Sequence, residues 1–243
     1  MDTAGVEVLL LAAVAAFALA VLSAVSGFGG GVLLLPVFTA LFGLRAAVPI
    51  LTLTQLASNG GRVWFNRREI RWPLVGWFAL GAVPLALAGG FAFVYAPLAP
   101  LKMLLGVFLI GVVIWRHIGK MPGRIGDRAF VGVGAASGLG SALLGSVGPL
   151  TAPFFLAYGL TRAAYIGTEA ASALTMHVSK LAAYGAGDLL TSEVLAYGLA
   201  LTPATIAGSW VGRRLVDRMS DRLFVIVVEL GLVVAGVLFL VGV

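Results

Sequence analysis

Two stretches of the chain follow one pattern: Gly31–Ala47 reads GVLLLPVFTALFGLRAA, and Gly148–Ala164, which begins 117 residues later, reads GPLTAPFFLAYGLTRAA. Laid over each other without a gap, they are identical at eight of 17 positions. The matches include a proline, a phenylalanine and an arginine in register, which an alanine- and leucine-rich background rarely produces. The chain therefore contains an internal repeat.

The composition of the 243-residue chain indicates a membrane protein. Hydrophobic residues make up 60% and charged residues 11%, with a mean hydropathy of +1.07, against about 45–50% and about 25% in soluble domains. Residues 73–94 carry no charge and residues 6–25 carry only Glu7. Because about 20 apolar residues cross a bilayer, we expect an all-α polytopic membrane protein. The first run lacks a basic n-region, so we expect a retained helix rather than a signal peptide.

Each repeat contains about five hydrophobic segments. The predicted segments are 6–25, 31–44, 46–61, 73–94, 98–115, 129–145, 149–159, 163–186, 193–212 and 223–243. An odd number per repeat makes the second half start from the opposite side of the membrane, so the two repeats have inverted topology, as is typical of secondary transporters. We assign residues 1–118 to the first transmembrane repeat, 119–128 to a basic linker and 129–243 to the second repeat.

Most of the basic residues gather in three loops, at 62–71, 116–128 and 213–222, which hold 12 of the 16 lysines and arginines. The positive-inside rule places these loops in the cytoplasm, and both termini outside, in the periplasm, for a multi-pass protein of the cell inner membrane. This explains the net charge of +6 and the pI of 10.2 without a nucleic-acid partner. The absence of cysteine excludes cysteine-based metal and haem sites, and we expect no cofactor or metal. Without a Gly-Lys-Ser/Thr loop, we expect no ATP hydrolysis.

A glycine-rich turn precedes an unusually short segment in each repeat. Ser26–Gly31 leads into 31–44, and Gly145–Pro149 leads into 149–159. At about 1.5 Å per residue these segments reach about 21 Å and about 17 Å, which is too short to cross a bilayer. Half-helices of this kind present free backbone N–H groups and a positive dipole end to an anion. The alternative is that the glycines only allow close helix packing. The candidate anion-binding residues are Gly29, Gly30, Gly31 and Gly148.

A polar stripe recurs at helical spacing in both halves. The first stripe contains Gln55, Ser58, Asn59 and Arg62, and the same offset of 117 places Ser172, Thr175 and Ser179 opposite its members. Polar groups in a membrane face the bundle interior or a water-filled cavity. We expect Gln55, Asn59 and Thr175 to orient a substrate there. The alternative is interhelical hydrogen bonding, which explains the small residues individually, whereas Gln55 and Asn59 are larger and costlier to bury.

A few titratable side chains lie within the apolar segments. His177, near the centre of 163–186, binds substrate or relays a proton, or is a buried neutral histidine. Lys180, placed toward the outer end, coordinates the anion or snorkels to the surface. Glu229 carries a coupling proton or pairs with a cytoplasmic arginine such as Arg213. Arg45, in a turn at a membrane face, fits gating or interfacial anchoring.

One enzymatic alternative is an intramembrane serine protease. Ala135-Ala136-Ser137-Gly138 approaches the Gly-x-Ser-Gly pattern of rhomboid-type proteases, with His177 as the base. The first glycine of that pattern is alanine here, and a protease does not explain the repeat. We therefore expect no enzyme and no catalytic residues.

Several of these motifs together resemble the TauE/SafE-type sulfite exporter family over essentially the whole chain. They are the turn Ser26–Gly31 running into Val32–Pro36, its echo before Pro153, the Gln55–Gly61 patch and the basic central loop. The resemblance implies inverted halves and export of small anions, commonly sulfite or organosulfonates such as sulfoacetate, coupled to a gradient of protons or sodium ions. A carboxylate permease or an importer of the same fold is the alternative, and glycine-rich faces are compatible with a homodimer. The second repeat departs from the pattern, because it reads Ser146-Val147-Gly148-Pro149 and lacks a full glycine run.

Overall fold

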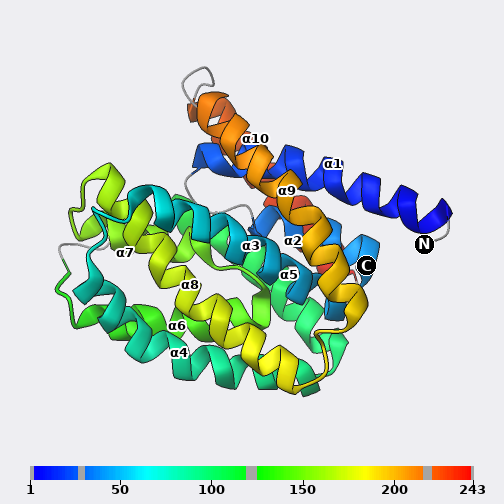
Figure 1. Ribbon diagram of the computed structural model, residues 1–243, viewed down its shortest axis with the longest axis horizontal. Coiled ribbons are helices and arrows are strands. Elements are labelled where there is room, and N and C mark those ends of the chain that lie inside the picture. The colour runs from blue at the N-terminus through cyan, green and yellow to red at the C-terminus, as the bar shows by residue number, and fades with distance from the viewer. Residues whose placement is uncertain (1–2, 27–30, 119–124, 216–220, 242–243) are drawn as a thin grey trace.

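The computed structural model describes residues 3–26, 31–118, 125–215 and 221–241 (Figure 1). Within these residues every regular element is a helix, and each predicted segment corresponds to one helix, so the all-α prediction is confirmed. The helices are α1 (Thr3–Ser26), α2 (Gly31–Phe42), α3 (Leu44–Asn66), α4 (Trp72–Tyr95), α5 (Leu98–Ile118), α6 (Ala129–Leu144), α7 (Gly148–Ala157), α8 (Arg162–Ala186), α9 (Ser192–Leu215) and α10 (Asp221–Leu240). By length and composition, α4 and residues Leu98–Trp115 of α5 are apolar enough to cross a membrane.

Three helices continue three or more residues past the predicted ends of their apolar segments. Helix α3 runs to Asn66, α5 to Ile118 and α9 to Leu215. The loop boundary predicted at residue 62 is therefore wrong, because Arg62 lies inside α3. Arginine is a good helix former, so a helix does not stop where its hydrophobicity stops.

Helices α2 and α7 are the short elements that the sequence predicts. They contain 12 and 10 residues, or about 18 Å and about 15 Å of helix, against about 30 Å for the hydrocarbon core. The chain reverses direction sharply before α7, because Gly145 has φ = 76°, a backbone conformation that side chains disfavour. Each short helix therefore needs a partner to bury its polar end.

The helices pack as two interlaced bundles (Figure 1). One, the α4 bundle, joins α4 to α6, α7 and α8 around a core that includes Phe78, Phe130 and Phe155. The other, the α9 bundle, joins α9 to α1, α2 and α3, with the α5–α10 pair packed alongside. Each bundle therefore combines helices from both halves of the sequence, and α3 and α8 meet where the bundles adjoin.

Glycines let α4 and α6 approach until their backbones touch. A methyl group added at Gly134 of α6 would overlap the carbonyl oxygen of Phe78, and one added at Gly81 of α4 would overlap that of Val131. Small residues at such crossings allow close packing, which is how apolar helices associate in a membrane. This contact holds the α4 bundle together.

We predict that Gly134→Ala destabilises the protein by about 1–3 kcal/mol, because the added methyl forces α4 and α6 apart. The matched control is Gly132→Ala on the same helix, where a methyl group meets open space; it should be neutral or slightly stabilising. Thermal unfolding of the purified variants in detergent provides the measurement. Equal melting temperatures for the two variants would contradict the close contact.

Candidate functional site

The N-terminus of α2 faces the turn between α6 and α7. A methyl group added at Gly31, the first residue of α2, would overlap the amide nitrogen of Gln55 and lie 2.9 Å from the Ser146 hydroxyl. Gly31 belongs to the first repeat and Ser146 precedes α7 in the second. The structure therefore brings together Gly31 and Gln55, two of the predicted site residues, beside the turn that leads to Gly148. Gly29 and Gly30 lie outside the described residues.

Two side chains of α8 bind the C-terminal end of α6. The Lys180 ammonium donates to Ser141 Oγ at 2.9 Å, to the Ser141 carbonyl at 3.3 Å and to the Gly145 carbonyl at 3.1 Å. The Tyr184 hydroxyl donates to the Ala142 carbonyl at 2.7 Å. The last carbonyls of a helix have no intrahelical partner, and cations stabilise that end. These bonds let α6 stop in apolar surroundings.

Of the two roles expected for Lys180, anion coordination and snorkelling to the surface, the second is wrong. The side chain is fully buried and does not reach the surface. Its side-chain nitrogen donates to the carbonyl of Gly145, the residue next to Ser146, so a hydrogen-bond donor lies directly behind the turn that faces Gly31. The i to i+4 spacing of Lys180 and Tyr184 indicates a shared helix face, but only the fold shows that this face meets α6.

A small cavity of about 20 Å³ adjoins Gly31 and Gln55, and Thr54, Ser58 and Thr205 also line it. A cavity of this size holds about one water molecule. An oxyanion of several heavy atoms does not fit in this conformation, so its binding requires the surrounding helices to move apart.

A chain of polar contacts links α3 and α8 close to this cavity. Arg62 Nη2 lies 2.8 Å from Glu169 Oε2, and Arg62 Nη1 donates to Asn59 Oδ1 at 3.0 Å. The Asn59 amide nitrogen lies 3.1 Å from His177 Nε2. Asn59 and His177, both predicted site residues, are buried and bonded to each other. At Asn59 the polar stripe therefore forms an interhelical hydrogen bond, which was the alternative to substrate binding.

Two hydroxyl groups that the sequence singled out bond within their own helix. Thr175 donates to the Ser172 carbonyl at 2.7 Å, and Ser137 donates to the Val133 carbonyl at 2.5 Å. Because His177 bonds to Asn59 and Ser137 to its own helix, the geometry provides no serine–histidine pair. The protease alternative has no support from these contacts.

Two polar side chains of the candidate site were not predicted from the sequence. Glu169 is a carboxylate within a predicted membrane segment, and such a residue is a functional candidate by default; it was not singled out. Ser146 was quoted only as part of its turn, and nothing local distinguishes it from other turn serines. Its importance comes from Gly31, which is more than a hundred residues away in sequence.

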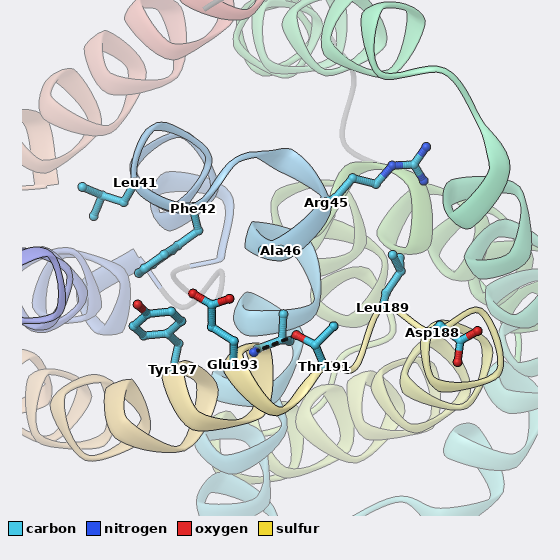
Figure 2. A pocket seen from close by; sticks show the side chains of 10 residues that line it. Leu41, Phe42, Arg45, Ala46, Asp188, Leu189, Thr191, Glu193 and Tyr197 are labelled. Atoms are coloured by element: carbon cyan, nitrogen blue, oxygen red, sulfur yellow. Dashed lines mark hydrogen bonds between the residues drawn. The ribbon is translucent and has the colours of Figure 1, made fainter. Parts of the chain in front are cut away.

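A larger cavity of about 490 Å³ opens at the end of the molecule where α2, α3 and the α8–α9 connection meet (Figure 2). Phe42, Glu193 and Tyr197 line it, and Figure 2 shows the Glu193 carboxylate beside the two aromatic rings, whose centroids lie 4.8 Å apart. The Arg45 guanidinium points away from Glu193 and Tyr197. It donates to carbonyls at the end of α4, those of Phe93, Val94 and Ala96. These bonds join the start of α3 to the end of α4, and the gating or interfacial anchoring expected for Arg45 stays a prediction.

Glu229 of α10 contacts a histidine of α5 in the structure. Its carboxylate lies 3.2 Å from His117 Nε2. The Arg213 side chain, the partner proposed from the sequence, lies outside the described part of the chain. The contact with His117 joins α10 to α5 near the end of α5.

Apolar helices, two of them too short to span a bilayer, are typical of a helical membrane transporter. A family model described as sulfite exporter TauE/SafE matches residues 11–239. The chain therefore belongs to the TauE/SafE sulfite exporter family, a family of membrane transporters of small anions. No curated protein and no solved structure matches the chain.

We predict that Gly31→Ala lowers the free energy of unfolding by about 1–3 kcal/mol, because the new methyl displaces the Gln55 amide and presses on Ser146. Gly60→Ala serves as the matched control, since a methyl group there meets open space. Thermal unfolding of both proteins tests the prediction. If Gly31→Ala is as stable as Gly60→Ala, the two segments do not meet.

Proposed function

We propose that this protein is an inner-membrane secondary transporter that exports small oxyanions, with sulfite or an organosulfonate such as sulfoacetate as its substrate. One observation carries the proposal: the N-terminus of α2, the Gln55 amide and the α6–α7 turn converge in front of the buried Lys180 ammonium. Backbone N–H groups, an amide and a cation are the groups that hold an oxyanion. The family membership supports the substrate class.

The proposed anion site combines Gly31, Gln55 and Gly148 with the charge of Lys180. Gly29 and Gly30 of the predicted turn are included on sequence grounds. Pro149 has no N–H group, so the α7 end offers fewer donors than the α2 end. Asn59 and Thr175 contribute indirectly in this proposal, because their side chains already bond to His177 and to the Ser172 carbonyl.

The packing of the helices supports inverted repeats. Each helix of the first half corresponds to the helix five places later in the second half, so α1 corresponds to α6 and α4 to α9. The contact between α1 and α9 then has its counterpart in the contact between α6 and α4, and the contact between α3 and α9 in that between α8 and α4. The pairs α3–α8 and α5–α10 each join two corresponding helices. A pseudo-two-fold axis between α3 and α8 produces this pattern, and transport sites lie at such axes.

We propose that the two bundles, rather than the two sequence halves, are the units that move against each other. The halves are interlaced, since α4 packs on α6 and α1 on α9. The α3–α8 interface then opens and closes around the anion. With the basic loops in the cytoplasm and both termini outside, an inside-negative potential drives anion exit by about 2.3 kcal/mol per charge for each 100 mV.

We predict that sulfite and small sulfonates raise the melting temperature of the purified protein and that chloride does not, because a ligand bound only to the folded state stabilises it. Gln55→Ala should lower the apparent affinity about tenfold, the effect of one lost charge-assisted hydrogen bond. Thr52→Ala is the matched control, because the Thr52 hydroxyl donates to the Val48 carbonyl within α3. Stabilisation by carboxylates alone would keep the architecture and reject the sulfur chemistry, and unchanged affinity in Gln55→Ala would reject the site.

We predict that a disulfide between α3 and α8 blocks transport. A Cβ at Gly167 would lie 2.9 Å from that of Asn66, so Asn66→Cys with Gly167→Cys can be oxidised in a chain without native cysteine. Anion flux in proteoliposomes should fall at least tenfold on oxidation and recover on reduction.

The control disulfide joins two helices of the same bundle. A Cβ at Gly187 would lie 3.1 Å from that of Val94, which places Val94→Cys and Gly187→Cys within reach across α4 and α8. Oxidation of this pair should leave flux unchanged, because α4 and α8 move together. Equal loss of flux in both pairs would reject movement between the bundles.

A further inference from the structure

The hydrogen-bond donors between α3 and α8 determine where His177 carries its proton. A guanidinium can only donate, so the Asn59 oxygen faces Arg62 and the Asn59 NH₂ group faces His177. Nε2 of the imidazole must then accept this bond. A neutral ring whose Nε2 accepts carries its proton on Nδ1.

The Nδ1 atom of His177 has no hydrogen-bond partner among the described residues. The ring is buried, with 4% of its surface exposed, so bulk water does not provide one. A buried donor without an acceptor loses the free energy of the hydrogen bond that it made to water. Such a donor fits a ligand that brings an acceptor when it binds.

The ring of His177 is linked to two parts of the proposed anion site. On one side it bonds to Asn59, which is one turn along α3 from Gln55. Along α8 it precedes Lys180 by three residues, and the Lys180 ammonium holds the turn that faces Gly31. The ring therefore lies in the α3–α8 interface, where the proposed function puts the anion.

The charged groups around the ring are all accounted for by other contacts. Helices α6 and α7 carry no charged side chain, and neither does α4. Helix α3 provides Arg62, while Arg45 lies at its other end on the α4 carbonyls. On α8, Glu169 pairs with Arg62, and Lys180 binds Ser141 and Gly145. Because Nε2 accepts the Asn59 bond and so carries no proton, the ring is neutral.

We propose that the Nδ1–H group of His177 is a hydrogen-bond donor for an oxygen of the transported anion, and that Asn59, Arg62 and Glu169 are positioning residues that fix this tautomer. The inference rests on the proposed function for the identity of the ligand. A fixed N–H donor selects acceptor-only groups such as sulfite and sulfonate oxygens. It disfavours a ligand that presents a donor at the same place.

The tautomer can be observed directly, because the chain contains only two histidines. Replacing the exposed His117 by glutamine leaves His177 as the single source of imidazole signals. Nitrogen-15 NMR of this variant, labelled at histidine and held in nanodiscs, should show a protonated Nδ1 and a bare Nε2. A proton on Nε2, or a charged ring, would overturn the proposal.

The positioning role is tested by exchanging a donor for an acceptor. Asn59→Asp, made in the His117→Gln background, should move the proton to Nε2, because the new carboxylate accepts where the amide donated. Asn66→Asp is the matched control on the same helix, since the Asn66 amide donates to the Arg62 carbonyl, and it should leave the spectrum unchanged. If Asn59→Asp does not fold, Asn59→Leu replaces it, and Nδ1–H should then no longer be the single tautomer. If neither Asn59→Asp nor Asn59→Leu alters the spectrum, Asn59 does not fix the tautomer of His177.

The ligand role is tested by adding sulfite or methanesulfonate to the same sample. Either anion should shift the Nδ1 resonance, chloride should not, and Asn59→Asp should weaken binding about tenfold relative to Asn66→Asp. An anion that stabilises the protein without moving Nδ1 would overturn this inference and leave the proposed function standing. If neither anion binds in the melting or the NMR experiment, the proposed function fails and the ligand role fails with it.

Discussion

The bonds from Lys180 and Tyr184 to the end of α6 are the interaction on which the rest of the site depends. A helix that ends in an apolar layer leaves carbonyl groups without water, and each must find a donor in the protein. The α8 side chains supply these donors at Ser141, Ala142 and Gly145. Because the end of α6 is satisfied in this way, the chain can turn and start α7 inside the fold. The turn then meets the beginning of α2.

A second basic side chain donates to the free carbonyl groups at the end of another helix. The Arg45 guanidinium binds the carbonyls of Phe93, Val94 and Ala96, where α4 ends. Both cations are thus neutralised by helix C-termini, whose partial negative charge substitutes for a carboxylate. This explains how apolar helices carry buried or half-buried basic groups at these points. Arg62 is different, because it pairs with the carboxylate of Glu169 between the two bundles.

Interlacing of the two halves decides where the polar residues lie. Each bundle takes one long helix from the other half of the sequence, so its own core can be wholly apolar, as around Phe130 and Phe155. Asn59 and Arg62 of α3 meet His177 and Glu169 of α8 at the surface between the bundles. A surface that has to separate and close again is better held by hydrogen bonds and an ion pair than by interdigitated apolar side chains, because water can replace the polar contacts when they break.

The ten helices, the two short ones among them, follow from the sequence because apolar runs and glycine-rich turns act over a few neighbouring residues. The polar stripe through Gln55 and Asn59 is equally local, since a 3.6-residue period places those side chains on one face. Periodicity does not say which helix that face meets. The bond from Asn59 to His177, the burial of Lys180 against α6 and the approach of Ser146 to Gly31 all join segments that are far apart in the chain. Only the packing of the helices brings these groups within a few ångströms of each other. The distance between two polar groups then decides whether they bond to each other or stay available to a ligand.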